Sequence, residues 1–197
     1  MNTIGHNLKL TVYGESHGKS IGAVLDGLPS GEYLDWDEVK KEMARRAPGK
    51  NTLSTSRKEG DAFDVQSGYF NNATTGTPLA VMIENTNTRS EDYDDLRHLM
   101  RPGHADYTGK VRYDGYNDYR GGGHFSGRLT APLVFAGAVA SQILARRGIH
   151  VGSHILQIHD VQDRPFNPVH EELSLLLSLK NLTLPLLDET RTEAMEQ

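Results

Sequence analysis

The first part of the chain alternates apolar and polar positions with the period of a β-strand. Residues 7–13 and 20–26 both follow this pattern, so we expect two half-buried strands joined by a glycine-containing loop. Asp35, with Glu38 three residues later, is typical of a capped helix start. We expect this helix to end near Arg46, before a Pro-Gly pair.

Two further apolar runs, 62–70 and 78–84, are separated by a turn-like stretch at 71–77, and we expect them to pair as antiparallel strands. Residues 89–128 are polar, rich in glycine and without clear periodicity. We interpret them as a long loop system, because loops of this length in compact domains usually carry function or are disordered.

The middle of segment 130–147 is apolar on every side, which predicts a helix that other layers must cover all round. Its small residues suit an inner layer between sheets. We expect Gly148 to cap this helix and 149–158 to return as a strand. A leucine-rich stretch at 173–187 then leads into a last helix that opens near Asp188.

Composition narrows the classes of function. The 197 residues include no cysteine, which excludes disulfides and thiolate metal sites. The net charge of −5 is carried entirely by residues 160–197, whereas residues 40–58 carry a charge of +6. A nucleic-acid surface needs a positive excess, so this balance argues against nucleic acid and favours a small, multiply anionic ligand.

The N-terminal residues 1–10 lack a basic region followed by an apolar core, so they do not form a signal peptide. By our reading no stretch reaches the roughly 20 apolar residues that span a bilayer. We therefore expect a cytoplasmic protein that does not enter the membrane.

Three glycine-rich segments carry candidate chemistry. In the first, Gly14–Gly18, Ser16 fits the G-x-S-x-G pattern of serine hydrolases, but that motif needs a helix directly after the serine and a strand pattern follows here. His17 lies in the same turn, and an imidazole there can exchange a proton near neutral pH. A loop histidine bonded to a backbone carbonyl is the alternative interpretation.

The second segment, Arg101–Tyr107, again places a histidine after glycine in a stiff turn. His104 is preceded by Arg101 and followed by Asp106, so this loop can present a cation and a proton donor together. The third segment, 118–128, precedes the apolar helix, where exposed N–H groups and the helix dipole suit a phosphate. A plain glycine-rich turn would also explain the third segment.

Together these segments resemble the chorismate synthase family. The pentapeptide at 14–18 resembles its first signature and 123–130 resembles its second. Between them, the motifs at 45–49, 74–78, 84–86, 101–108 and 118–123 are also similar to family motifs. The resemblance covers about residues 1–160 in unbroken order.

This resemblance implies a lyase that converts 5-enolpyruvylshikimate 3-phosphate to chorismate and phosphate by a 1,4-elimination with reduced FMN. It implies acid–base roles for His17 and His104. The anionic substrate would be bound by Arg46, Arg101 and Arg128, and FMN by Arg46, His124, Phe125 and Ser126. NADPH is a possible source of reducing equivalents, and no metal is implied.

The implied fold is α+β, a β-α-β sandwich of antiparallel sheets around buried inner helices, in a chain that assembles as a homotetramer. We expect residues 1–197 to form a single domain of this kind, truncated at its C-terminus, because family chains continue with a second half. This chain departs from the Arg-Ser-Ser of many members at 124–126, which could alter flavin contacts.

Two other classes of protein remain open from the residues alone. One is a non-catalytic fragment or interaction module that binds a partner through the leucine-rich segment. The other is a metal hydrolase that uses His17, His104, Asp106 and His124, although no ligand pair has the i, i+4 spacing of an H-E-x-x-H helix.

Overall fold

The computed structural model describes residues 2–47, 60–86 and 99–197. The chain divides into two compact units, Met1–Gln142 and Ile143–Gln197. The first unit contains all the candidate site residues. That the whole chain forms one domain stays a prediction.

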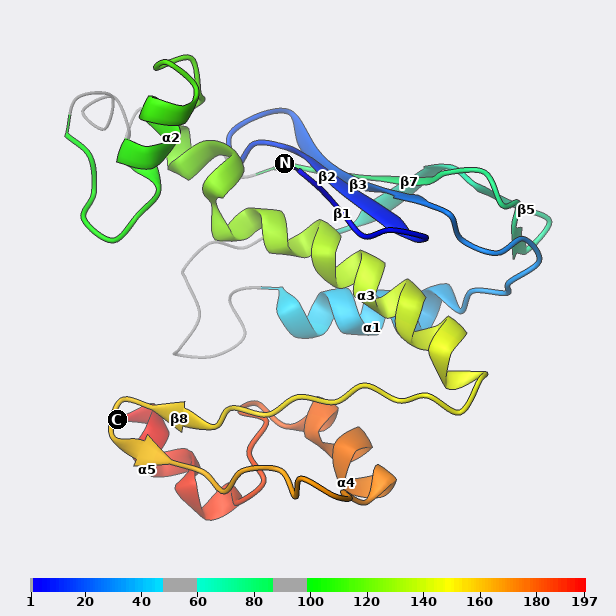
Figure 1. Ribbon diagram of the computed structural model, residues 1–197, viewed down its shortest axis with the longest axis vertical. Coiled ribbons are helices and arrows are strands. Elements are labelled where there is room, and N and C mark those ends of the chain that lie inside the picture. Colours follow the sequence, from blue (N-terminus) through cyan, green and yellow to red (C-terminus); the bar gives the residue numbers. More distant parts are fainter. Residues whose placement is uncertain (1, 48–59, 87–98) are drawn as a thin grey trace. The chain divides into compact units, whose positions relative to one another are not determined.

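A five-stranded antiparallel sheet organises the first unit (Figure 1). In spatial order its strands are β1 (Thr3–Ile4), β2 (Lys9–Gly14), β3 (Ser20–Asp26), β7 (Leu79–Glu84) and β4 (Phe63–Ser67). The expected strands at 7–13 and 20–26 are confirmed, as is the antiparallel pairing of the runs at 62–70 and 78–84. A further short hairpin pairs the end of the first run, β5 (Tyr69–Phe70), with β6 (Ala73–Thr74) in the turn.

The core lies on one face of the central strands. Alternate residues of β3 and β7 are fully buried, and Ile21 pairs directly with Ile83. Helices α1 (Trp36–Arg46) and α3 (Thr130–Ala145) lie side by side on the same side of this sheet (Figure 1). Aromatic rings join the layers, because Phe135 of α3 packs 5.0 Å from Phe63 of β4.

Helix α1 forms as its sequence predicts. The Asp35 carboxylate accepts hydrogen bonds from the N–H groups of Asp37 and Glu38, and Val39 and Met43 face the core. The reciprocal half of the expected capping box is absent, because the Asp35 N–H donates to Oε1 of Gln142 on α3 instead. Tertiary contact thus completes a cap that starts as a local motif.

Helix α3 also forms where it was expected, and Gly148 ends it. Gly148 has a φ of +73°, and the N–H of Ile149 donates to the carbonyl of Leu144 at 3.0 Å, as in a left-handed helix cap. The described residues do not cover this helix on every side, since Leu133 is 42% exposed. The described residues place a sheet against one side of the helices, so the sandwich is not confirmed.

The stretch expected to be a long loop contains regular structure in its described part, 99–128. Helix α2 (Asp106–Arg112) and two 3₁₀ turns, η2 (Arg120–Phe125) and η3 (Gly127–Leu129), lie there. Helix α2 was not predicted because it is short and because its N-cap, Ala105, makes no side-chain cap hydrogen bond. The rest of this predicted loop, residues 89–98, lies outside the described residues.

The second unit packs short elements around a small core. These are β8 (Gln157–Ile158), β9 (Val161–Gln162), α4 (Leu173–Ser178), η4 (Leu179–Asn181), η5 (Glu189–Arg191) and α5 (Thr192–Glu196). The predicted strand over 149–158 is wrong except at β8, because the N-terminal part of this run is exposed and forms no ladder. The helix predicted to open near Asp188 is confirmed, with the Asp188 carboxylate as its cap.

A buried carboxylate holds the loops of the second unit together. Asp163 accepts hydrogen bonds from the N–H groups of Arg164, Leu187 and Asp188. Burial acts to raise the pKa of Asp163, but these backbone donors and His154 outweigh it and lower the pKa. The carboxylate therefore stays charged and satisfied inside this unit.

Candidate acid–base site

Two glycines of one loop bring the two predicted acid–base histidines to a common place. Gly121 and Gly122 lie in η2, and a Cβ atom on Gly121 would overlap Cε1 and Nδ1 of His17. A Cβ atom on Gly122 would lie 2.7 Å from Cε1 and 2.9 Å from Nε2 of His104. The three glycine-rich segments therefore converge, although up to 110 residues separate them in the chain.

Only glycine allows this convergence. Gly121, Gly122 and Gly123 have φ values of +56°, +84° and +55°, in a region that other residues rarely adopt. Their missing side chains leave the space that the imidazoles of His17 and His104 occupy. The glycine triplet is thus a packing surface for two histidines as well as a turn.

His17 is nearly buried and is held by residues that are distant in sequence. The neighbouring Ser16 N–H donates to the carbonyl of Gly123 at 3.1 Å. On the other side, the side-chain amide of Asn85 donates to the carbonyls of Glu15 and Gly18 at 3.0 and 2.9 Å. The turn that carries His17 is therefore fixed from two directions.

His104 is held within its own loop. Its Nδ1 lies 2.7 Å from Oδ1 of Asp106, and Arg101 Nη2 lies 3.2 Å from the same ring nitrogen. The Arg101 guanidinium donates to both oxygens of Asp106, and this pairing lowers the pKa of Asp106 well below its ordinary value. Nε2, the other ring nitrogen, lies beside Gly122.

A second arginine–aspartate fork lies in the glycine-rich segment itself. Arg120 donates through Nε and Nη2 to the two oxygens of Asp118 at 2.9 and 2.7 Å. This hydrogen bonding lowers the pKa of Asp118, and the electrostatic influence of His17 acts in the same direction. Both residues belong to the third glycine-rich segment, but their pairing was not predicted.

Arg46 and Arg128, the two other predicted anion ligands, meet at one carboxylate. Both guanidinium groups form salt bridges with Asp61, whose side chain is fully buried. Arg128 also donates to Oδ1 of Asn85 at 3.1 Å and to the carbonyl of Glu84 at 3.3 Å. Asp61 was missed, because nothing in its local sequence indicates that it would pair with two arginines 15 and 67 residues away.

The described part of the predicted cationic patch is mostly surface. Lys40 pairs with Asp37 and Arg45 with Glu42 along the exposed face of α1, and such pairs contribute little. Arg46 alone among these turns toward Asp61. The members of the patch at 48–59 lie outside the described residues.

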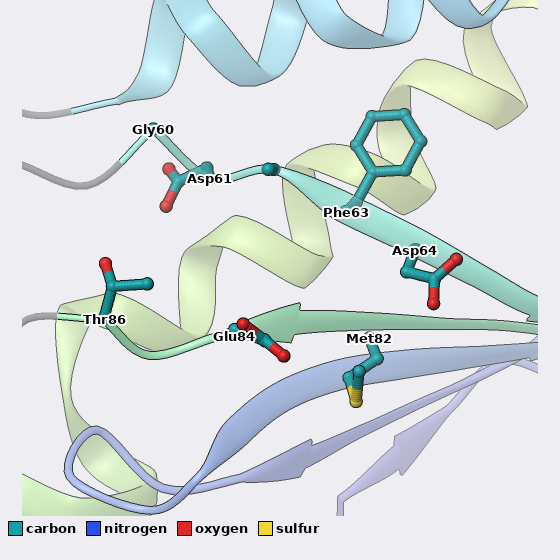
Figure 2. A pocket seen from close by; sticks show the side chains of 8 residues that line it. Gly60, Asp61, Phe63, Asp64, Met82, Glu84 and Thr86 are labelled. Carbon is teal, nitrogen blue, oxygen red and sulfur yellow. The ribbon is translucent and has the colours of Figure 1, made fainter.

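A cavity of about 270 Å³ lies beside Asp61 (Figure 2). Its lining includes the carboxylates of Asp61, Asp64 and Glu84, together with Met82 from β7. An acidic lining does not suit an anionic ligand, and neither His17 nor His104 contributes to it. We therefore place the candidate chemistry at the histidines rather than in this cavity.

The residues predicted to contact FMN lie next to this site. His124 Nδ1 is 2.8 Å from the carbonyl of Gly14, the Phe125 ring is partly exposed, and the Ser126 hydroxyl accepts from the N–H of Arg128. Among the described residues, the space beside the α-carbon of Gly127 is open. An exposed ring beside open backbone at a helix start fits a planar, phosphate-bearing group. The His124 ring itself is occupied in joining two loops.

Two alternative functions, a serine hydrolase and a metal hydrolase, lose support. Ser16 is 1% exposed and is followed by β3 rather than a helix, which does not match a serine hydrolase elbow. Within residues 2–47, 60–86 and 99–197, no group of three or more His, Cys, Asp or Glu side chains could hold a metal ion.

The fold and the site together define an α+β protein in which two histidines lie against a glycine-rich turn and arginines of the same unit pair with aspartates. Comparison with known proteins identifies the family to which this chain belongs. Residues 8–197 match the sequence profile described as chorismate synthase, so the chain belongs to the chorismate synthase family.

Curated relatives and a solved structure agree with this assignment. Chorismate synthase of Sulfurovum sp. is 48% identical over 162 residues, which cover 82% of this chain and 45% of the relative. That of Thermococcus kodakarensis is 44% identical over 191 residues, 97% of this chain and 51% of the relative. A crystal structure of chorismate synthase matches with a TM-score of 0.69 and 26% identity, covering 97% of this chain and 52% of that one. The chain thus spans about half the length of these proteins.

One helical run is long enough to be tested as a membrane span. Arg120–Ala145 covers 26 residues and is apolar enough by composition, but half of its most apolar window is buried in the protein. The non-helical φ values at Gly121–Gly123 interrupt this run, and α3 itself has 16 residues, about 24 Å. The core helix of a soluble protein passes the same test, so the evidence for a span is weak.

Proposed function

We propose that this chain carries the acid–base half of a chorismate synthase, a lyase of the shikimate route to aromatic amino acids. The reaction is the 1,4-elimination of phosphate from 5-enolpyruvylshikimate 3-phosphate, in which a C–O bond to phosphate breaks and a ring carbon loses a proton. The observation that carries the proposal is the convergence of His17 and His104 on adjacent glycines, in a chain of this family.

His17 is proposed as the acid that protonates the departing phosphate. Its nearly buried position, against Gly121 and close enough to Asp118 to influence that carboxylate, supports a defined orientation. His104, with Nδ1 beside Asp106 and Nε2 beside Gly122, is proposed to balance the proton of the reduced flavin. Two histidines held in different ways can serve two different proton transfers.

The arginines are proposed to bind the anionic groups of the substrate. Two carboxylates and a phosphate require several cations, and Arg46, Arg101 and Arg128 all lie in the first unit. Arg101 is the most exposed of the three and adjoins His104. Arg46 and Arg128 share Asp61, which would hold their guanidinium groups in a fixed geometry.

Reduced FMN is the proposed cofactor, with NADPH as a possible reductant. The backbone around His124, Phe125 and Ser126 and the side chain of Arg46 are proposed to contact it. When bound, reduced FMN lends electron density to the elimination and is returned unchanged, so the reaction has no net redox change. The protein's own residues orient the substrate and move the protons.

The oligomeric state and the cellular location that we propose are those implied by the family. We propose a homotetramer in the cytoplasm, without nucleic-acid or membrane partners. The use of the leucine-rich segment as a separate interaction module is not favoured, because the family match runs through it to residue 197.

Anaerobic phosphate release from 5-enolpyruvylshikimate 3-phosphate with reduced FMN tests the proposal. We expect turnover from the protein extended to the full length of its relatives and little or none from the 197-residue chain, because family chains carry part of the flavin site in their second half. If the extended protein neither turned over nor bound FMN, the proposed function would be wrong.

A further inference from the structure

One asparagine side chain joins the loop of His17 to the arginine pair. Asn85 directly follows β7, and its Nδ2 donates to the carbonyls of Glu15 and Gly18, the residues that flank the Ser16–His17 pair. Its Oδ1 accepts from Nε of Arg128 at 3.1 Å. A single amide therefore makes three hydrogen bonds to two separate segments.

These partners permit only one orientation of the amide. Carbonyl oxygens accept hydrogen bonds and a guanidinium only donates them, so Nδ2 must face the loop and Oδ1 must face Arg128. Aspartate at position 85 would keep the bond to Arg128 but would place a charge against two carbonyls. No other side chain of this length supplies two donors and an acceptor in this arrangement.

The amide is itself anchored at both ends. The Asn85 N–H donates to the carbonyl of Lys19 at 3.1 Å, which extends the ladder between β3 and β7 by one bond. Arg128 is almost entirely buried and is bound to Asp61 and to the carbonyl of Glu84. A rigid sheet edge and a buried arginine thus fix the position of the loop.

We propose that Asn85 is a positioning residue, which holds the backbone on both sides of His17 at a set distance from Arg128. The inference rests on the proposed function, because it assigns the amide to the orientation of the proposed acid. It acts through His17 and does not require contact with substrate. Geometry of this kind matters because small misplacements of a reacting group can cost about 10²-fold in rate.

Amide hydrogen exchange in the 197-residue chain tests the structural step without any activity. In N85A we expect the N–H groups of Ser16 and Gly18 to exchange about tenfold faster or more, since their loop loses two anchors. The N–H groups of Gly31 and Thr74, which are bonded elsewhere in the unit, serve as internal references. Asn7 is exposed, and N7A is the matched control.

A second variant keeps this test decisive. N85D retains an acceptor for Arg128 and loses both donors, so we expect the same faster exchange at Ser16 and Gly18. Unchanged exchange in both variants would overturn the proposal. Loss of the folded spectrum in both would also overturn it, because Asn85 would then be required for folding rather than for positioning.

Kinetics of the protein extended to family length test the link to His17. We expect N85A to lower kcat about tenfold or more with a small change in KM, and to have no further effect when combined with H17A. An N85A loss that persists in the H17A background would show that Asn85 does not act through His17. Absence of turnover in the unsubstituted protein would count against the proposed function alone, since the exchange result stands apart from it.

Discussion

The two histidine loops of the first unit are built in opposite ways. His104 takes its orientation from Arg101 and Asp106, both within three residues of it. His17 takes its orientation from Asn85 and from the glycine triplet at 121–123, all far away in the chain. One loop is a self-contained motif, and the other exists only when β3, β7 and η2 are assembled.

This difference has a physical consequence. A loop held by its neighbours keeps its geometry when the surrounding structure changes, because its contacts close over a few residues. A loop held by distant segments depends on every element that positions those segments. We therefore expect the His17 loop to be the more sensitive of the two, and His104 to tolerate remote changes.

Removal of each imidazole has the largest expected effect. We expect H17A and H104A each to lower turnover of the protein extended to family length by on the order of 10²-fold or more, the usual scale of acid–base catalysis. Phosphate release under anaerobic conditions measures this, with the exposed His6 replaced by alanine as a control. An unchanged rate in either variant would remove that histidine from the mechanism.

Alanine substitutions at Gly121 and Gly122 test the difference between the two histidine loops directly. A methyl group at Gly121 meets the nearly buried His17, and one at Gly122 meets the far end of the more exposed His104. We expect G121A to destabilise the chain by about 2 kcal/mol and G122A by about half as much, because His104 can move aside. Urea unfolding measures both, and an equal or reversed order would contradict the comparison.

The smallest effect is the pH response of the self-contained loop. The pKa of Asp106 is lowered by Arg101, so its pairing contributes stability above about pH 4 and loses it only as the pH falls further. We expect the NMR signals of Arg101 and Gly103 to show an acid transition well below pH 4 that reports Asp106. In D106N this acid transition should disappear, and a transition that survived would belong to another group.

Much of the fold follows from local patterns. The strands at 9–14 and 20–26, the Asp35 cap and the end of α3 at Gly148 all lie where the sequence predicts them. Helix α2 and the irregular run at 149–156 do not, because short elements depend more on packing than on periodicity.

The residues of the candidate site also fall into those that local patterns indicate and those that they do not. His17, His104 and Arg101 could be proposed from short motifs, because glycine, proline and charge in a few positions already indicate a functional loop. Asp61 could not, and Asn85 stood out only as part of the family-like motif at 84–86, without a role, since the partners of each are more than ten residues away. Long-range pairing leaves no pattern in a single sequence.

The amino-acid sequence alone determined which side chains could perform the chemistry, and it determined the local geometry of the His104 loop. Only the tertiary structure decided that His17 lies against Gly121 while His104 lies against Gly122, and that one amide joins the His17 turn to Arg128. The reason is physical. Local conformation follows from neighbours along the chain, whereas contacts between distant segments are fixed by the pairing of β3 with β7 and by the contact of η2 with the loop after β2.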